Sequence, residues 1–306
     1  MGFVGRDIVS IKDFSREEID HILKTTDEVE ALTKKSSHAL DGKVMASLFF
    51  EPSTRTRLSF ESAMYRLGGS CLGFAEPKVA SVQKGENLAD TVRVVESYAD
   101  ILVIRHPLEG AARLAAEFAS VPVINAGTGA EEHPTQAMLD LYTMKREFGK
   151  IDGLDVALAG DLRYGRTVHS LAYALSLYNI NLHLVSPAML RMRKEVLEEV
   201  NGRINVQESE DLSQAVPKVD VIYMTRIQKE RFGSLEDYEK MRGSYVLTAA
   251  DLTRARPRMI VMHPLPRVDE IEYTVDATPH AKYFKQVWYG LLVRMSLIGL
   301  VLGALS

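Results

Sequence analysis

Three hydroxyl groups and two guanidinium groups stand together in the segment Ser53-Thr54-Arg55-Thr56-Arg57. The apolar run at residues 44–50 predicts a buried strand before it, and apolar residues at helical spacing follow it as far as Gly68-Gly69. The segment should therefore form the first turn of a helix, where each cation costs about 0.3–1 kcal/mol against the helix dipole. A bound phosphate would offset this cost, because charge-assisted hydrogen bonds contribute about 1.5–3 kcal/mol each. The pattern favours an anion site over a polar helix start with solvated arginines.

Polar residues also follow the other predicted strands. In chain order these are Arg105, the segment His133-Pro134-Thr135-Gln136, Arg166 in the loop after residue 159, Arg226-Ile227-Gln228, and His263-Pro264-Leu265-Pro266-Arg267. Ligands of open α/β sheets bind outside the carboxyl ends of the strands. We therefore expect these side chains to collect where a ligand would bind. Their distribution over the strand ends is stronger evidence for a ligand site than any single motif.

Apolar strands and amphipathic helices alternate along the chain. Strands are predicted at residues 44–50, 101–104, 121–124, 156–159, 182–185, 219–224 and 259–262, and helices at 88–98, 111–118, 135–148, 167–178 and 188–200. Ser15 and Glu18 have capping-box spacing and mark a first helix. This order predicts an α/β fold with two doubly wound parallel-sheet domains. We expect residues 1–134, completed by a C-terminal helix 288–306, to form one domain and residues 135–287 the other, with the active site in the crevice between them.

Composition excludes several classes of protein. The chain has 306 residues, 46% of them apolar and 25% charged, and its net charge of -4 argues against a nucleic-acid partner. Cys71 is the single cysteine, which leaves no disulfide or Cys-based zinc site and suits a reducing cytoplasm. The histidines show no metal spacing, so no metal or other cofactor is expected. The start of the chain lacks a signal-peptide core, and the apolar run 291–305 is interrupted by Arg294, which favours a buried helix over a membrane span.

Several of these residues have alternative interpretations. Residues 160–167 resemble a P-loop in which Arg166 replaces the lysine that bridges nucleotide phosphates. Arg166 and Arg226 could instead bind a dicarboxylic acid, since paired guanidiniums suit carboxylates. The default interpretation of the segment around Arg226 is a solvated loop. Arg105 alone could be a structural salt-bridge partner, and His133 a structural histidine near a helix cap.

Three motifs in their order along the chain carry a resemblance to a known family. The segments Ser53-Thr54-Arg55-Thr56-Arg57, His133-Pro134-Thr135-Gln136 and His263-Pro264-Leu265-Pro266-Arg267 resemble those of the aspartate/ornithine carbamoyltransferases over essentially the whole chain. Arg226-Ile227-Gln228 and the His-Pro-Leu-Pro sequence match the aspartate type. The ornithine type typically carries His-Cys-Leu-Pro and a Ser-Met-Gly loop, and neither is present.

The resemblance implies transfer of a carbamoyl group from carbamoyl phosphate to the α-amino group of L-aspartate, the committed step of pyrimidine synthesis. It implies that Ser53, Thr54, Arg55, Thr56 and Arg105 hold the phosphate, that Thr56, Arg105 and His133 surround the carbonyl oxygen, and that Gln136 orients the carbamoyl amide. Arg166, Arg226 and Gln228 would bind the aspartate carboxylates, and Leu265 and Pro266 would offer backbone carbonyls to the reacting nitrogens.

The resemblance also implies a homotrimer with shared active sites. Each site would borrow a serine and a lysine from the neighbouring subunit, which correspond to Ser81 and Lys84 here. Lys84 would then help to bind aspartate. Separate regulatory chains and allosteric control are left open.

Three alternatives to this function are kept. The nearest is a relative acting on ornithine or another amine. The second is a P-loop enzyme that binds nucleotides with magnesium. The third is a two-domain solute-binding protein that captures a small anion without chemistry.

Overall fold

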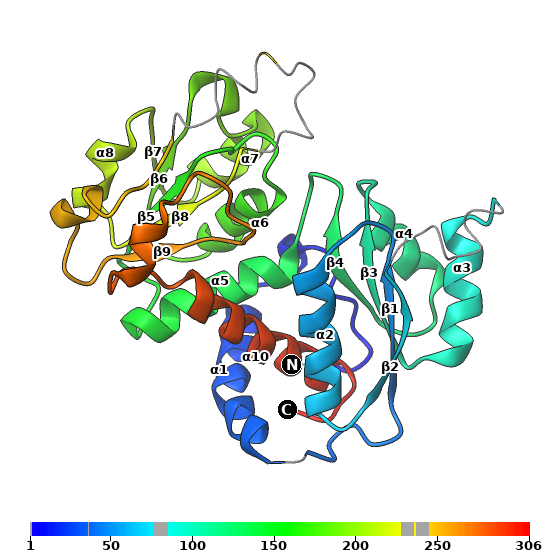
Figure 1. Cartoon of the computed structure of the whole chain (residues 1–306). Helices are drawn as coiled ribbons and strands as arrows, with labels where there is room; N and C mark the ends of the chain where they lie inside the picture. The colour runs from blue at the N-terminus through cyan, green and yellow to red at the C-terminus, as the bar shows by residue number, and fades with distance from the viewer. Residues whose placement is uncertain (1, 36, 76–84, 228–235, 237–244) are drawn as a thin grey trace. The chain divides into compact units, whose positions relative to one another are not determined.

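The computed structural model in Figure 1 describes residues 2–35, 37–75, 85–227, 236 and 245–306. The chain divides into two compact units. Unit 1 contains Met1–Leu139 and Trp288–Ser306, and unit 2 contains Asp140–Val287. The division falls inside two helices, α5 (Pro134–Phe148) and α10 (Tyr283–Val301). The boundary predicted between residues 134 and 135 lies at the start of the same α5.

Unit 1 contains a parallel sheet with the strand order β2-β1-β3-β4. Its strands are β1 (Val44–Phe49), β2 (Ser70–Phe74), β3 (Ile101–His106) and β4 (Val123–Thr128). Its helices include α1 (Arg16–Val29), α2 (Thr54–Arg66), α3 (Leu88–Val95) and α4 (Ala111–Phe118), with short 3₁₀ turns at Ile11–Asp13, Glu30–Lys34 and Glu96–Tyr98. In Figure 1, α3 and α4 lie on one side of the sheet and α2 on the other.

The strands of unit 1 form a buried core because their side chains alternate between two apolar faces. Ala46 and Leu48 of β1 pack with Val92 of α3 and Ala115 of α4. On the other side of the sheet, α2 buries Phe60 together with two further apolar residues of its sequence. Both faces being covered explains why the strands appear in the sequence as continuous apolar runs.

Unit 2 contains a second parallel sheet with the order β7-β6-β5-β8-β9. Its strands are β5 (Asp155–Ala159), β6 (Asn181–Val185), β7 (Asn205–Ser209), β8 (Val221–Met224) and β9 (Ile260–Met262). Its helices include α6 (Arg166–Leu175), α7 (Lys194–Asn201) and α8 (Leu212–Ala215), and 3₁₀ turns lie at Ala188–Leu190, Val216–Lys218, Asp251–Arg254 and Tyr273–Ala277. A core cluster joins β5, β8 and β9 through Ala157, Ile222 and Val261.

The predicted α/β class with two parallel sheets is confirmed. Each of the seven predicted strands is present, and most of the strand ends lie within one or two residues of the prediction. Strands β2 and β7 were not predicted. Both are at sheet edges and mostly exposed, so neither has an apolar run. The single helix predicted at residues 188–200 is wrong. Its sequence forms a 3₁₀ turn and α7, separated by extended backbone at Arg191 and Arg193.

Two local predictions about helices are confirmed. Ser15 caps α1 in a capping box with Glu18, in which each side chain accepts a hydrogen bond from the other residue's backbone N–H. The apolar C-terminal run lies in α10, whose residues from Leu291 to Val301 are buried, Arg294 included. Throughout the described part of the chain, no helix has the length and apolarity needed to cross a bilayer.

Candidate active site

The junction between β1 and α2 holds the first polar cluster. Helix α2 begins at Thr54, and Ser53 is its N-cap residue, but the Ser53 hydroxyl does not cap the helix. The backbone N–H of Arg57 donates to the Ser53 carbonyl at 3.2 Å, which closes the first turn. The N–H groups of the three residues before Arg57 precede the first intrahelical bond, as at every helix start. This turn is therefore a positive pole that carries two threonine hydroxyls, as the sequence predicted.

The two arginines of this turn differ in their surroundings. The Arg57 guanidinium pairs with Glu61 one turn later, with Nε and Oε1 2.7 Å apart. This part-buried pair joins residues four apart on α2, so the Arg57 charge is paired within the helix itself. Arg55 is exposed. Of the two cations predicted at the helix start, Arg55 is therefore the more exposed to a ligand in solvent.

Arg105 lies at the carboxyl end of β3, beside the end of β1. The sheet register pairs Arg105 with Phe49, so Arg105 is near the start of α2. Its guanidinium is largely buried, donates to the Ala126 carbonyl at 3.1 Å, and forms an ion pair with Glu51 at 2.7 Å. Glu51 was not predicted. Its position directly after β1 was the available signal, although a carboxylate beside an expected anion site argues against such a choice.

His133 and Gln136 lie where the loop after β4 enters α5. Pro134 is the first helical residue, where its missing N–H has no cost. The His133 carbonyl accepts the N–H groups of Gln136 at 3.0 Å and Ala137 at 3.2 Å. Both predicted side chains are buried, with residue exposures of 4% for His133 and 8% for Gln136. Since β4 pairs with β3, the ends of β1, β3 and β4 bring the predicted residues of unit 1 to one edge of its sheet.

The loop after β5 positions Arg166 in unit 2. Gly160 has φ +109°, and a Cβ there would approach the Thr225 carbonyl oxygen to 2.3 Å, so only glycine fits between β5 and β8. The buried Asp161 carboxylate then accepts the N–H groups of Arg163 at 3.2 Å and Tyr164 at 2.9 Å. This turn delivers Arg166 as the first residue of α6.

The ends of β8 and β9 hold the remaining predicted residues of unit 2. Thr225 donates its N–H to the Ala159 carbonyl at 2.8 Å, which fixes the backbone just before Arg226. In the loop after β9, Leu265 has φ +54° and its peptide bond to Pro266 is cis. Strands β5, β8 and β9 are neighbours in the sheet, so Arg166, Arg226 and this loop follow adjacent strand ends.

His263 organises the loop after β9 from within the core. The Leu265 N–H donates to His263 Nδ1 at 2.7 Å, so the ring proton is on Nε2, which donates to Glu270 Oε1 at 2.6 Å. Burial lowers the pKa of His263, and the ring is therefore neutral near pH 7. Burial opposes ionisation of Glu270, but hydrogen bonds from His263 and from the Val268 N–H hold its pKa below the ordinary value.

Glu270→Gln should destabilise the protein at pH 7 by about 1.5–3 kcal/mol, the contribution of hydrogen bonds to a charged group. Because the folded state lowers the pKa of Glu270, its contribution is present above the unfolded value near 4.5 and is lost as the pH falls through the folded value. The difference from the unsubstituted protein in urea unfolding should therefore shrink below about pH 4.5. Glu272→Gln, at an exposed position, is the control, and a difference independent of pH would contradict this account.

Three predicted residues, Ser81, Lys84 and Gln228, lie outside the described residues. Among the residues that are described, no group of three or more His, Cys, Asp or Glu could hold a metal ion.

Comparison with known families identifies the chain. The model of the aspartate/ornithine carbamoyltransferase carbamoyl-P binding domain matches residues 6–146, and that of the Asp/Orn binding domain matches residues 152–301. The chain belongs to the aspartate/ornithine carbamoyltransferase family. The predicted resemblance is confirmed, and the P-loop alternative is left without support.

Individual relatives match this chain over 96–100% of their length. The aspartate carbamoyltransferase catalytic subunit of Thermococcus onnurineus is 56% identical over 309 residues, with 100% of each chain covered. The catalytic subunit of M. jannaschii aspartate transcarbamoylase is 52% identical, with a TM-score of 0.89 and 96% of each chain covered. Aspartate transcarbamoylase from Trypanosoma cruzi in complex with carbamoyl phosphate and aspartate is 41% identical, with a TM-score of 0.94 and 98% of each chain covered.

Proposed function

We propose that this chain transfers the carbamoyl group of carbamoyl phosphate to the α-amino group of L-aspartate, giving N-carbamoyl-L-aspartate and phosphate. The observation that carries the proposal is the TM-score of 0.94 to a transcarbamoylase in complex with both substrates. The 56% identity to an aspartate carbamoyltransferase catalytic subunit supports the choice of aspartate over ornithine. We assign the reaction to pyrimidine synthesis in the cytoplasm, where the free thiol of Cys71 is compatible with a reducing environment.

Unit 1 is proposed to bind carbamoyl phosphate. The first turn of α2 supplies Ser53, Thr54, Arg55 and Thr56 to the phosphate oxygens, because this turn carries N–H groups, hydroxyls and a guanidinium. Arg105 joins them from the end of β3. Thr56, Arg105 and His133 contact the carbonyl oxygen, and Gln136 holds the carbamoyl amide. A buried imidazole and a buried amide at the start of α5 suit a small polar group.

Unit 2 is proposed to bind L-aspartate. Arg166 and Arg226 follow the adjacent strands β5 and β8, an arrangement that suits two carboxylates of one small acid. Gln228 is assigned to the same task. Leu265 and Pro266 present backbone carbonyls to the reacting nitrogens, and the His263–Glu270 pair fixes the backbone at Leu265.

The chemistry requires no nucleophilic side chain. The neutral amine nitrogen of aspartate attacks the carbonyl carbon, a C–N bond forms, and the carbonyl oxygen becomes an anion. The bond from that carbon to the phosphate oxygen then breaks, and the departing phosphate accepts the proton that the amine loses. Positioning two substrates can supply about 7–11 kcal/mol of the acceleration. Each donor to the developing oxyanion contributes about 2.7–4 kcal/mol.

Purified protein given carbamoyl phosphate with either L-aspartate or L-ornithine tests the proposal. Carbamoyl-aspartate and phosphate should appear in equal amounts with aspartate, and ornithine should give no turnover. Turnover with ornithine alone would assign the chain to the other branch of the family. Binding of carbamoyl phosphate without turnover of either amine would favour the solute-binding alternative.

We further propose that the active form is a homotrimer in which Ser81 and Lys84 of one subunit complete the site of its neighbour. Lys84→Ala and Arg55→Ala chains should each be inactive alone. After the two are unfolded together and reassembled, each mixed trimer should contain one site with both native residues. Equal mixing then restores roughly a quarter of the native activity. Self-reassembled samples of each variant are the controls, and mixed trimers without activity would argue against shared sites.

A further inference from the structure

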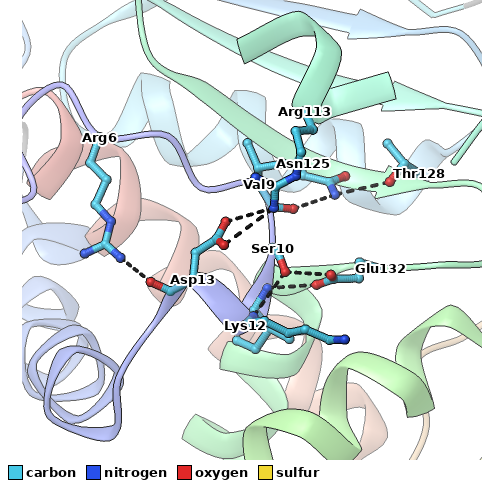
Figure 2. A network of polar contacts seen from close by, with 10 residues as sticks. Arg6, Val9, Ser10, Lys12, Asp13, Arg113, Asn125, Thr128 and Glu132 are labelled. Atoms are coloured by element: carbon cyan, nitrogen blue, oxygen red, sulfur yellow. Dashed lines mark hydrogen bonds and ion pairs between the residues drawn. The ribbon is translucent and has the colours of Figure 1, made fainter. Parts of the chain in front are cut away.

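The N-terminal segment before α1 pairs with β4 through an isolated parallel bridge at Ile8. Ile8 donates its N–H to the Val123 carbonyl at 2.8 Å, and the Asn125 N–H donates to the Ile8 carbonyl at 2.9 Å, which is a parallel bridge. The Asn125 side-chain amide donates to the Val9 carbonyl at 2.9 Å and also contacts the Thr128 hydroxyl at 3.3 Å (Figure 2). Main-chain and side-chain bonds together fix this segment to the strand that leads into His133.

The same segment holds the carboxylate of Glu132, the residue before His133. The Ser10 hydroxyl donates to Glu132 Oε1 at 2.6 Å, as Figure 2 shows, and the Ile11 N–H donates to Oε2 at 2.8 Å. Ser10 Oγ accepts the Lys12 N–H at 3.1 Å, which orients the hydroxyl toward the carboxylate. Both carboxylate oxygens of this buried side chain are therefore bound to residues more than a hundred positions away in the sequence.

The backbone of Glu132 is fixed as well. Its carbonyl accepts the Thr128 N–H at 3.2 Å, so the loop between β4 and α5 closes on itself. One residue later, the His133 carbonyl accepts two N–H groups of the first turn of α5. The backbone of His133 is thus fixed on one side by α5 and on the other by Glu132, which accepts three hydrogen bonds.

Burial of an acidic group here has a cost. Burial raises the pKa of Glu132, while the donors Ser10 and Ile11 act in the opposite direction and favour the carboxylate. The neighbouring charged groups are Lys12 and Glu131, of opposite sign, so charge pairing with a single cation does not explain the position. If Glu132 only filled space in the core, an apolar residue could take its place and would need no hydrogen bonds from Ser10 and Ile11.

We infer that Glu132 is a positioning residue for His133, through which the N-terminal segment at Ser10 and Ile11 sets the place of the imidazole in the active site. This inference rests on the proposed function, in which His133 contacts the carbonyl oxygen. The N-terminal segment thereby acts on the active site through Glu132.

A double-mutant cycle on the full-length protein tests the inference. Glu132→Ala should lower kcat about 10–100-fold, the range for a reacting group displaced by about 1 Å, with a small change in the KM for aspartate. In a His133→Ala background the same substitution should change kcat less than about twofold, because the group that Glu132 positions is gone. Equal factors in both backgrounds would assign Glu132 a structural role only and overturn the inference.

Matched variants complete the test. Glu131→Ala is the control, since the Glu131 carboxylate is exposed and accepts the Gly110 N–H at 3.2 Å, and kcat should be unchanged. If Glu132→Ala fails to fold, Ser10→Ala with His133→Ala forms an equivalent cycle, and Glu132→Gln should recover part of the activity by keeping one acceptor.

A measurement independent of turnover separates this inference from the proposed function. In protein labelled with ¹⁵N-histidine, Glu132→Gln should shift the His133 ring signals and Glu131→Gln should not. Unshifted signals would overturn the inference even if the enzyme is active. An unsubstituted protein without carbamoyl transfer would instead reject the proposed function, whatever the ring signals show.

Discussion

Arg55→Ala should lower kcat by about 10²–10³-fold and weaken the binding of inorganic phosphate, while the fold remains intact. The Arg55 side chain is exposed in the first turn of α2, so its loss creates no buried cavity. Its charge is expected to act on the phosphate as the C–O bond breaks and negative charge moves onto the leaving group. A donor that acts on charge developing in the transition state has an effect of this size.

Arg57→Ala provides the matched control for Arg55. It removes a guanidinium from the same turn of α2, but one whose partner is Glu61 on the same helix. A surface pair of this kind contributes roughly 0.3–0.5 kcal/mol, so turnover and phosphate binding should remain near native. Calorimetric titration with phosphate and steady-state kinetics measure both variants. Near-native turnover of Arg55→Ala, or equal losses in the two variants, would contradict the assignment of the phosphate site.

Arg166→Ala should raise the KM for aspartate by about 10–100-fold, corresponding to the loss of a charge-assisted hydrogen bond of about 1.5–3 kcal/mol. The KM for carbamoyl phosphate should change little, because the proposed ligands of its phosphate belong to unit 1. The position of Arg166 at the start of α6 is fixed by the turn that Asp161 caps, so the alanine variant retains the backbone of the loop.

Arg163→Ala is the control for Arg166. Arg163 lies in the loop that leads to Arg166, but it is exposed, stacks on the Tyr164 ring and donates to the Met189 carbonyl at 3.4 Å. Substitution of Arg163 should leave both KM values near native. If Arg166→Ala raised the two KM values by the same factor, its assignment to the aspartate carboxylates would fail.

The interior strands could be predicted from the sequence because both faces of each sheet are covered. Residues 44–49 of β1 and residues 155–159 of β5 are almost entirely buried, and they appear in the sequence as apolar runs. Strands β2 and β7 pair on one edge only and expose most of their side chains, so neither shows a run or an alternation. Their place in the sheets depends on backbone pairing with β1 and β6, which the residue types do not encode locally.

The same contrast holds for the candidate site. The motif residues could be predicted because hydroxyls, guanidiniums and histidines are rare in such density directly after apolar runs. Their acidic partners could not be predicted. Glu51 forms an ion pair with the motif residue Arg105. Glu132, the residue before the motif residue His133, accepts a hydrogen bond from Ser10. Each of these contacts joins distant parts of the sequence. A charged side chain acquires a partner only when the fold closes, and a sequence pattern cannot distinguish such a residue from a solvated one.

Unit 1 contains both ends of the chain, and this has a consequence for synthesis on the ribosome. Gly5 donates its N–H to the Val301 carbonyl at 2.9 Å, and Ser296 of α10 contacts the Ile22 carbonyl of α1. Unit 1 cannot be completed until residues 288–306 have emerged, whereas unit 2 has its full sequence once residue 287 has been translated. Nascent chains should therefore present the surface of unit 1 that α10 covers to chaperones throughout elongation. Ribosomal stalling before residue 288 would leave the first half of the protein as the unfinished half.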